Sequence, residues 1–175
     1  AIEVDGVIIV DPIECNTGAT FAGDVSIGGD LTVTGSGAGK ILQVVHASTS
    51  TTSAIDSTSF TDCTNLTASI TPASSSNKIL AIAECNGISS ASSDSSAATL
   101  QLLRNSNTVA LTTNMGYSQS EDLHQSVTFV SLDDAENTNA HVYKVQMKNR
   151  VSGEVALNNT TSGDYSSITL LEVAA

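Results

Sequence analysis

The stretch HVYKVQMKNR, His141–Arg150, alternates in chemical character from one residue to the next. Because successive side chains of a β-strand point to opposite faces of its sheet, the alternation predicts a strand with one buried and one polar face. The buried face takes His141, Tyr143, Val145, Met147 and Asn149, and the opposite face takes Val142, Lys144, Gln146, Lys148 and Arg150. We interpret the second face as a solvated surface that balances nearby carboxylates. Contact with an acidic partner or a neighbouring subunit is the alternative.

Shorter runs of similar character fill residues 40–175, and polar turn sequences such as TPASSSN and NNTTSGD separate them. The predicted strands are Ile41–Ala47, Phe60–Cys63, Leu66–Thr71, Lys78–Asn86, Thr99–Arg104, Thr108–Thr112, Ser126–Leu132, His141–Arg150, Glu154–Asn158 and Ser166–Val173. No convincing helix interrupts them, although residues 91–97 tolerate a brief helical turn. Many short strands joined by polar turns are typical of an antiparallel β-sandwich or jelly roll. The sequence therefore predicts an all-β head domain over residues 40–175.

A six-residue phrase is repeated before this domain, as GDVSIG and then GDLTVT over Gly23–Thr34. One face of the repeat is apolar and consists of Val25, Ile27, Leu31 and Val33. Two short strands cannot bury their apolar side chains alone. We therefore expect three chains to wind around one axis as a trimer stem. A two-residue hairpin within one subunit, turning at Gly28 and Gly29, satisfies the same alternation. Residues 18–39 are assigned to this stem and to the flexible joint GSGAG that follows it.

Residues 1–17 are expected to form an extended docking arm. Its apolar side chains first alternate with acidic ones and then form an unbroken run that ends before Pro12. These apolar residues are Ile2, Val4, Val7, Ile8, Ile9 and Val10. A strand that is apolar on both faces needs cover on both sides, so the arm is predicted to add to the sheet edge of a partner. An edge strand within its own domain is the alternative.

The charge balance limits the classes of partner. The net charge is −12, with 18 Asp and Glu against 6 Lys and Arg, whereas a nucleic-acid surface needs clustered basic residues. No apolar run reaches the roughly 18 residues of a membrane span, so a membrane partner is not expected. The start AIEVDG lacks the basic and apolar regions of a signal peptide. The three cysteines, Cys15, Cys63 and Cys85, have no C-x-x-C spacing and are expected to be reduced thiols.

The sequence contains no recognisable catalytic constellation. His46, His124 and His141 are far apart and lack metal-ligand spacing, and His141 is expected to be a satisfied structural histidine. The segment GSGAGK, Gly35–Lys40, lacks the spacing of a phosphate-binding loop, and no serine lies in a G-x-S-x-G elbow. We therefore predict no catalytic residue, no metal site and no cofactor.

Two acid pairs and two tyrosines are expected in loops. The acid pairs Glu121–Asp122 and Asp133–Asp134 are expected in loops, as solvated turns in preference to a Ca²⁺ site, because no EF-hand pattern surrounds them. Sugar sites usually stack a ring on an aromatic face, and aromatic residues make up only 3% of this chain. Tyr117 and Tyr165 lie in predicted loops and are the best candidates for contact with a glycan.

Several motifs taken together resemble a domain common in virion proteins of tailed phages, frequent in phages of aquatic bacteria and often described as tail fibre or structural protein. The motifs are GKILQVVHAS (Gly39–Ser48), SITPASSSNKIL (Ser69–Leu80), LQLLRNSNTVAL (Leu100–Leu111), HVYKVQ (His141–Gln146) and SSITLLEVAA (Ser166–Ala175). The repeat at Gly23–Thr34 is similar to the β-rich shaft elements that precede such domains. The resemblance covers residues 39–175 and implies a trimeric, all-β virion protein without catalysis.

The short chain departs from the long fibres of that family, which favours a position on the capsid. We expect a homotrimeric capsid decoration protein, of the cement or head-fibre type, on the virion surface and made in the cytoplasm of a bacterial host. Its expected partners are other copies of itself and the major capsid protein or another virion protein. The alternative is a tail fibre or receptor-binding module that recognises a host surface glycan.

Overall fold

The computed structural model describes residues 40–90, 96–115, 123–151, 153–159 and 163–175. These residues form ten β-strands and no helix. The strands are β1 (Ile41–Thr49), β2 (Ser53–Ile55), β3 (Thr61–Ile70), β4 (Lys78–Ser90), β5 (Ala98–Arg104), β6 (Asn107–Met115), β7 (Leu123–Asp134), β8 (His141–Asn149), β9 (Val155–Leu157) and β10 (Ser166–Val173). The predicted arm, the stem and Tyr117 lie outside the described residues.

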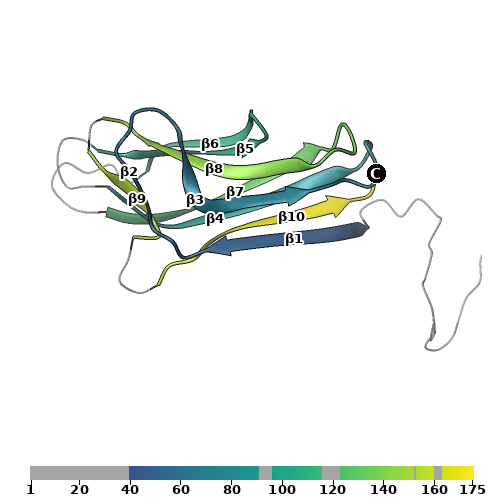
Figure 1. The fold of residues 1–175 in the computed structure, drawn as a ribbon, viewed down its shortest axis with the longest axis horizontal. Helices are drawn as coiled ribbons and strands as arrows, with labels where there is room; N and C mark the ends of the chain where they lie inside the picture. Colours follow the sequence, from purple (N-terminus) through teal and green to yellow (C-terminus); the bar gives the residue numbers. More distant parts are fainter. Residues whose placement is uncertain (1–39, 91–95, 116–122, 152, 160–162) are drawn as a thin grey trace, which may run out of the picture. The chain divides into compact units, whose positions relative to one another are not determined.

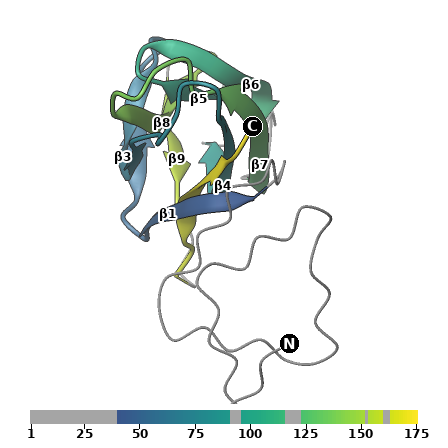
Figure 2. The same cartoon turned by 90° about the vertical axis from the view of Figure 1, so that its right-hand side faces the viewer.

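The strands pair into two antiparallel sheets (Figure 1). The first sheet has the order β1-β10-β4-β9-β2, and β7 also pairs with β4. The second sheet has the order β3-β8-β5-β6. In Figure 2, β3 and β8 of the second sheet lie across the interior from β4 and β7 of the first. The predicted all-β sandwich is confirmed.

Strand β4 organises the first sheet, because it is 13 residues long and has more than two neighbours. Its first half pairs with β10 on one side and β7 on the other, and its last two residues pair with β9. A register shift between Cys85 and Ile88 separates the halves, and Gly87 has a positive φ of 59° there. Glycine adopts a left-handed backbone more readily than other residues, so Gly87 accommodates the register shift.

The core lies between the sheets and follows the alternation of the strands. On β4, the side chains of Ile79, Ala81, Ala83 and Cys85 are fully buried. On β8, the residues predicted to face inward are all buried, and those between them are half-buried or exposed. The alternation of the quoted stretch therefore identified the buried face of a central strand correctly.

Several predicted strand bounds are wrong. The predicted strands Phe60–Cys63 and Leu66–Thr71 form one strand, β3, which is interrupted by a bulge between Asp62 and Thr67. Within that bulge Asn65 has a positive φ of 59°, a conformation that Asn tolerates better than most residues. Strand β2 was not predicted, because three residues among serines and threonines carry too little apolar signal.

The acid pair Asp133–Asp134 was predicted to lie in a loop, and that prediction is also wrong. Both residues belong to β7, where they pair with Ile79 and Lys78 of β4. The carboxylates point to opposite faces of the sheet, as neighbours in a strand do. Asp134 forms an ion pair with Lys78, while Asp133 points to the interior side.

A buried polar cluster joins the two sheets at Asp133. Arg104 of β5 is 5% exposed, and its guanidinium lies 3.2 Å from the Asp133 carboxylate and 2.9 Å from that of Glu136. The guanidinium also donates to the Asp134 carbonyl. The Tyr143 hydroxyl donates to Asp133 at 3.0 Å, and burial together with the Asp133 charge raises the pKa of Tyr143. The cluster therefore fixes β7 against β5 and β8.

A second buried carboxylate holds the turn sequence TPASSSN. Glu172 of β10 is fully buried and accepts hydrogen bonds from Asn77 Nδ2 at 2.6 Å, Gln43 Nε2 at 2.6 Å and the Ala73 amide at 2.7 Å. Burial alone raises the pKa of Glu172, but these donors outweigh it and the pKa lies below its ordinary value. The carboxylate thus ties the turn before β4 to β1 and β10.

Candidate functional site

The outer side of the first sheet carries an apolar row that crosses four adjacent strands. One row across the sheet runs from Val44 of β1 through Leu171 and Leu80 to Leu132 of β7, each residue opposite the next. In the next row Ile82 lies opposite Val130, while β10 and β1 contribute Thr169 and His46. We call this surface the apolar face, and it consists of Leu42, Val44, Leu80, Ile82, Val130, Leu132, Leu171 and Val173.

The apolar face is exposed. The side chains at its margins are the most accessible, with 58% of Val44, 64% of Val130 and 63% of Leu132 exposed. Residues on the inner strands are half-buried, because neighbouring strands shield their flanks. Exposed apolar residues scattered singly are normal, but a contiguous patch marks a surface that binds something.

The sequence carried a signal for this face that was not used. Strand β4 reads KILAIAE at its start and β10 reads SSITLLEV, so both strands have apolar side chains on each of their faces. A strand that is apolar on both faces needs cover on both sides. That argument was applied to Val7–Val10 alone, although β4 and β10 satisfy it equally well.

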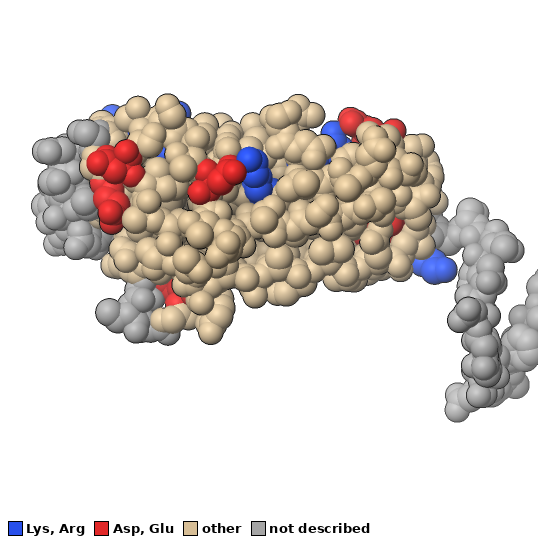
Figure 3. All heavy atoms as spheres, viewed as in Figure 1, with Lys and Arg blue, Asp and Glu red and all other residues tan. Residues whose placement is uncertain are grey.

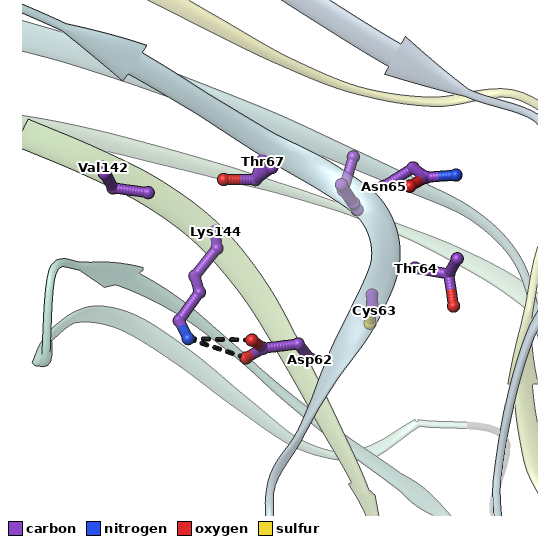
Figure 4. Close-up of a pocket in the computed structure, with 8 residues that line it drawn as sticks. Asp62, Cys63, Thr64, Asn65, Thr67, Val142 and Lys144 are labelled. Carbon is purple, nitrogen blue, oxygen red and sulfur yellow. Dashed lines mark hydrogen bonds and ion pairs between the residues drawn. The ribbon is translucent and has the colours of Figure 1, made fainter.

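A hollow of about 420 Å³ lies at the bulge of β3 (Figure 4). Lys144 reaches across from β8 to Asp62 at 2.9 Å, and Gln146 Nε2 donates to the same carboxylate at 2.6 Å. Burial raises the pKa of Asp62, but these two partners outweigh it and hold the pKa below its ordinary value. The hollow is thus closed on one side by an ion pair that is already satisfied.

The basic face of β8 is used within the domain. Lys144 pairs with Asp62, and the Lys148 ammonium lies 4.7 Å from the centre of the Phe60 ring. A cation over an aromatic ring is attracted by its negative face. The Lys144–Asp62 pair fits the prediction of a surface that balances nearby carboxylates, whereas Lys148 contacts an aromatic ring. On the side shown in Figure 3, charged side chains form small groups separated by uncharged surface.

The described cysteines are free and buried, as expected for reduced thiols. Burial and the charge of Asp62 raise the pKa of Cys63 to about 12, and burial raises the pKa of Cys85 as well. The thiolate is the nucleophilic form of cysteine. Both thiols are therefore protonated at neutral pH and unsuited to nucleophilic attack.

The histidines lie in different settings. His46 is exposed on β1 and bonds to the Thr169 hydroxyl at 2.9 Å. His141 is buried, and its Nε2 donates to the Ala135 carbonyl at 2.8 Å, but its Nδ1 has no hydrogen-bond partner. The prediction of a satisfied histidine thus holds for one ring nitrogen only.

A smaller hollow of about 220 Å³ brings His124 near Ser126 and Asp164. The described residues show no hydrogen bond among these three side chains. Within the described ranges, no three His, Cys, Asp or Glu side chains gather where they could hold a metal ion. The same residues include no helix with the length and hydropathy needed to cross a bilayer.

Tyr165 is the one of the two tyrosines predicted to contact glycan that lies within the described residues, and its side chain is accessible. Tyr165 is 65% exposed and lies immediately before β10. Asn86 Nδ2 donates to its backbone carbonyl at 2.6 Å, so the backbone at Tyr165 is held against β4.

Comparison with known proteins shows a structural likeness but no matching family model. No protein-family model and no curated protein matches it. Among solved structures, it is similar to dimeric latent PorU from Porphyromonas gingivalis, with 8% identity and a TM-score of 0.32. The match covers 80% of this chain and 14% of that one. The class defined by the described residues is an antiparallel β-sandwich with one apolar outer face.

Proposed function

We propose that this chain is a non-enzymatic structural protein of a tailed-phage particle, a homotrimer that decorates the outside of the capsid. Residues 1–17 dock on the major capsid protein or another virion protein, residues 23–34 join three chains, and the head projects from the shell. The motifs between Gly39 and Ala175 that resemble virion proteins support this assignment.

The observation that carries the proposal is the apolar face. A protein that acts alone in water rarely exposes a contiguous apolar patch, whereas a subunit of an assembly covers it with a neighbour. The face extends over four strands, and its margins at Val44 and Leu132 are more than half exposed. An exposed apolar sheet on a chain with a net charge of −12 favours a protein that works as part of an assembly.

Immunogold labelling of intact phage particles tests the position. An antibody raised against residues 40–175 is expected to label the particle head at many points. Label confined to the tail would contradict capsid decoration and support the fibre alternative. Particles without any label, in a preparation whose lysate contains the protein, would contradict both positions on the virion.

The second candidate function is a tail fibre or receptor-binding module that recognises a host surface glycan. The exposure of Tyr165 favours it, because a sugar ring stacks on an accessible aromatic face. If this function is correct, Tyr165→Ala reduces binding to host envelope polysaccharide at least tenfold in a glycan-binding assay. Leu111→Ala, which removes a side chain of similar exposure (56%) on β6, is the control and leaves binding unchanged. Equal binding by both variants and the wild type would argue against Tyr165 as a contact.

A further inference from the structure

We infer that the apolar face is the interface between copies of this chain, so that the first sheet of one head packs against the first sheet of the next. The inference rests on the proposed function in one respect, since that function requires several copies to assemble. The inference identifies the surface through which the heads meet. The copies are then held together at this surface of the head as well as at the stem.

The outer side of the sheet has the layout of such an interface, with the apolar face bordered by polar side chains. Along the eight residues of β10, which rise about 3.3 Å each, four strands about 4.8 Å apart give the outer side of the sheet an outline of roughly 19 by 26 Å, or about 500 Å². The apolar face occupies the part of this outline nearer Val173. The accessible area of protruding side chains exceeds this flat outline. A stable interface takes about 800 Å² from each partner, with an apolar centre and a polar rim. Thr128, Ser167 and Thr169 lie along the margins of the face and provide that rim.

Charge favours a second copy over other occupants. Two copies that each carry a charge of −12 repel one another, so they associate best where the surface is least charged. On the outer side of these four strands, Asp134 is neutralised by its ion pair with Lys78. Glu84, in the middle of β4, is then the one unbalanced charge among the described residues of this surface.

The chain's own N-terminal segment fits the face less well. Residues 1–39 carry no Lys or Arg, and their acidic residues are Glu3, Asp5, Asp11, Glu14, Asp24 and Asp30. That segment would bring further negative charge beside Glu84, whereas a second apolar face brings a balanced Lys78–Asp134 pair and a single Glu84. Moreover, β1 begins at Ile41 on the margin of the face. Heads that meet there bring the starts of their β1 strands together, as a shared stem requires.

The test uses the full chain of 175 residues and two double variants matched for exposure. Val44→Lys with Leu132→Lys places two charges on the apolar face, at side chains that are 58% and 63% exposed. Leu111→Lys with Val142→Lys places the same charges on the second sheet, at side chains that are 56% and 40% exposed. Because all four side chains are at the surface, both variants are expected to fold, which thermal unfolding by circular dichroism checks.

Mass photometry across a dilution series then gives the dissociation constant of the oligomer. The wild type is expected to be oligomeric, the variant on the apolar face to dissociate at least tenfold more readily, and the variant on the second sheet to match the wild type. A monomeric wild type, or an unchanged dissociation constant in the variant on the apolar face, would overturn the inference. Equal weakening in both double variants would overturn it as well.

A stem variant separates this inference from the proposed function. Ile27→Asp with Val33→Asp is expected to weaken the trimer by charging the apolar side of the stem. If this variant dissociates while the variant on the apolar face does not, the stem holds the trimer, and the inference about the head fails while capsid decoration stands. If immunogold label is absent from the virion while the apolar face controls oligomerisation, the proposed function fails and the interface stands.

Discussion

Arg104→Met lowers the free energy of unfolding by about 3–5 kcal/mol, the usual cost of removing one partner of a buried ion pair. Arg104 and Asp133 have side chains only 6% and 16% exposed. Without the guanidinium, the Asp133 carboxylate keeps its hydrogen bond from Tyr143 but loses its counter-charge in a poorly solvated site. Methionine fills much of the same volume, so the loss reports charge and hydrogen bonding more than an empty space.

Urea unfolding at pH 7 and a fixed protein concentration measures this effect. Lys78→Met is the matched control, because it breaks an ion pair to Asp134 whose side chains are 46% and 63% exposed. Exposed pairs contribute about 0–1 kcal/mol, so the control is expected to be nearly neutral. If the two variants lose similar stability, Arg104 does not hold the two sheets together.

Glu172→Gln lowers the free energy of unfolding by about 2–4 kcal/mol at pH 7, because hydrogen bonds to a charged acceptor are strong and an unsatisfied buried donor is costly. The glutamine amide nitrogen faces Asn77, Gln43 and the Ala73 amide, all of which are donors. At least one of them loses its acceptor. The turn between β3 and β4 is the region expected to loosen.

The contribution of the Glu172 carboxylate to the free energy of unfolding decreases at low pH. Its folded-state pKa lies below the ordinary value of 4.5, so the ionised form is the one that the fold stabilises. This stabilisation is complete above about pH 4.5 and is lost as the pH falls through the lower folded-state pKa. The difference in the free energy of unfolding between the wild type and Glu172→Gln is therefore constant from pH 7 to 5, and it becomes smaller below pH 5.

Urea unfolding at several pH values between 3 and 7 follows this difference. Glu84→Gln is the control, since Glu84 is exposed on the same sheet, and it changes stability little at any pH. A difference between wild type and Glu172→Gln that stays constant down to pH 3 would show that the Glu172 carboxylate is not preferentially ionised in the fold.

The local alternation of apolar and polar residues predicted many of the strands in the head domain. The alternation in β8 identified its buried residues, and the bounds of β10 match the prediction at both ends. Both results depend only on the direction of side chains along one extended segment. That direction alternates from residue to residue, so it follows from the order of apolar and polar residues in the sequence. The bulge in β3 was missed, because the alternation continues on either side of it and nothing local marks a left-handed Asn65.

The partners of the buried charges were not predictable in the same way. Arg104 lies 29 residues from Asp133, and Glu172 lies almost a hundred residues from Asn77. Nothing in the neighbourhood of either residue distinguishes it from an exposed charge. The pairs exist because β5 and β7 belong to different sheets that pack together, and because β10 lies between β1 and β4.

The sequence by itself determined that residues 40–175 form short antiparallel strands with alternating faces, because side-chain alternation is a property of each strand alone. It did not determine which apolar face of β4 and β10 is covered. Only the tertiary structure decided that, since the order β1-β10-β4, with β7 alongside, turns one apolar side of these strands toward the second sheet and leaves the other exposed. The burial of a two-sided apolar strand depends on which layers lie above and below it, and those layers come from distant parts of the chain.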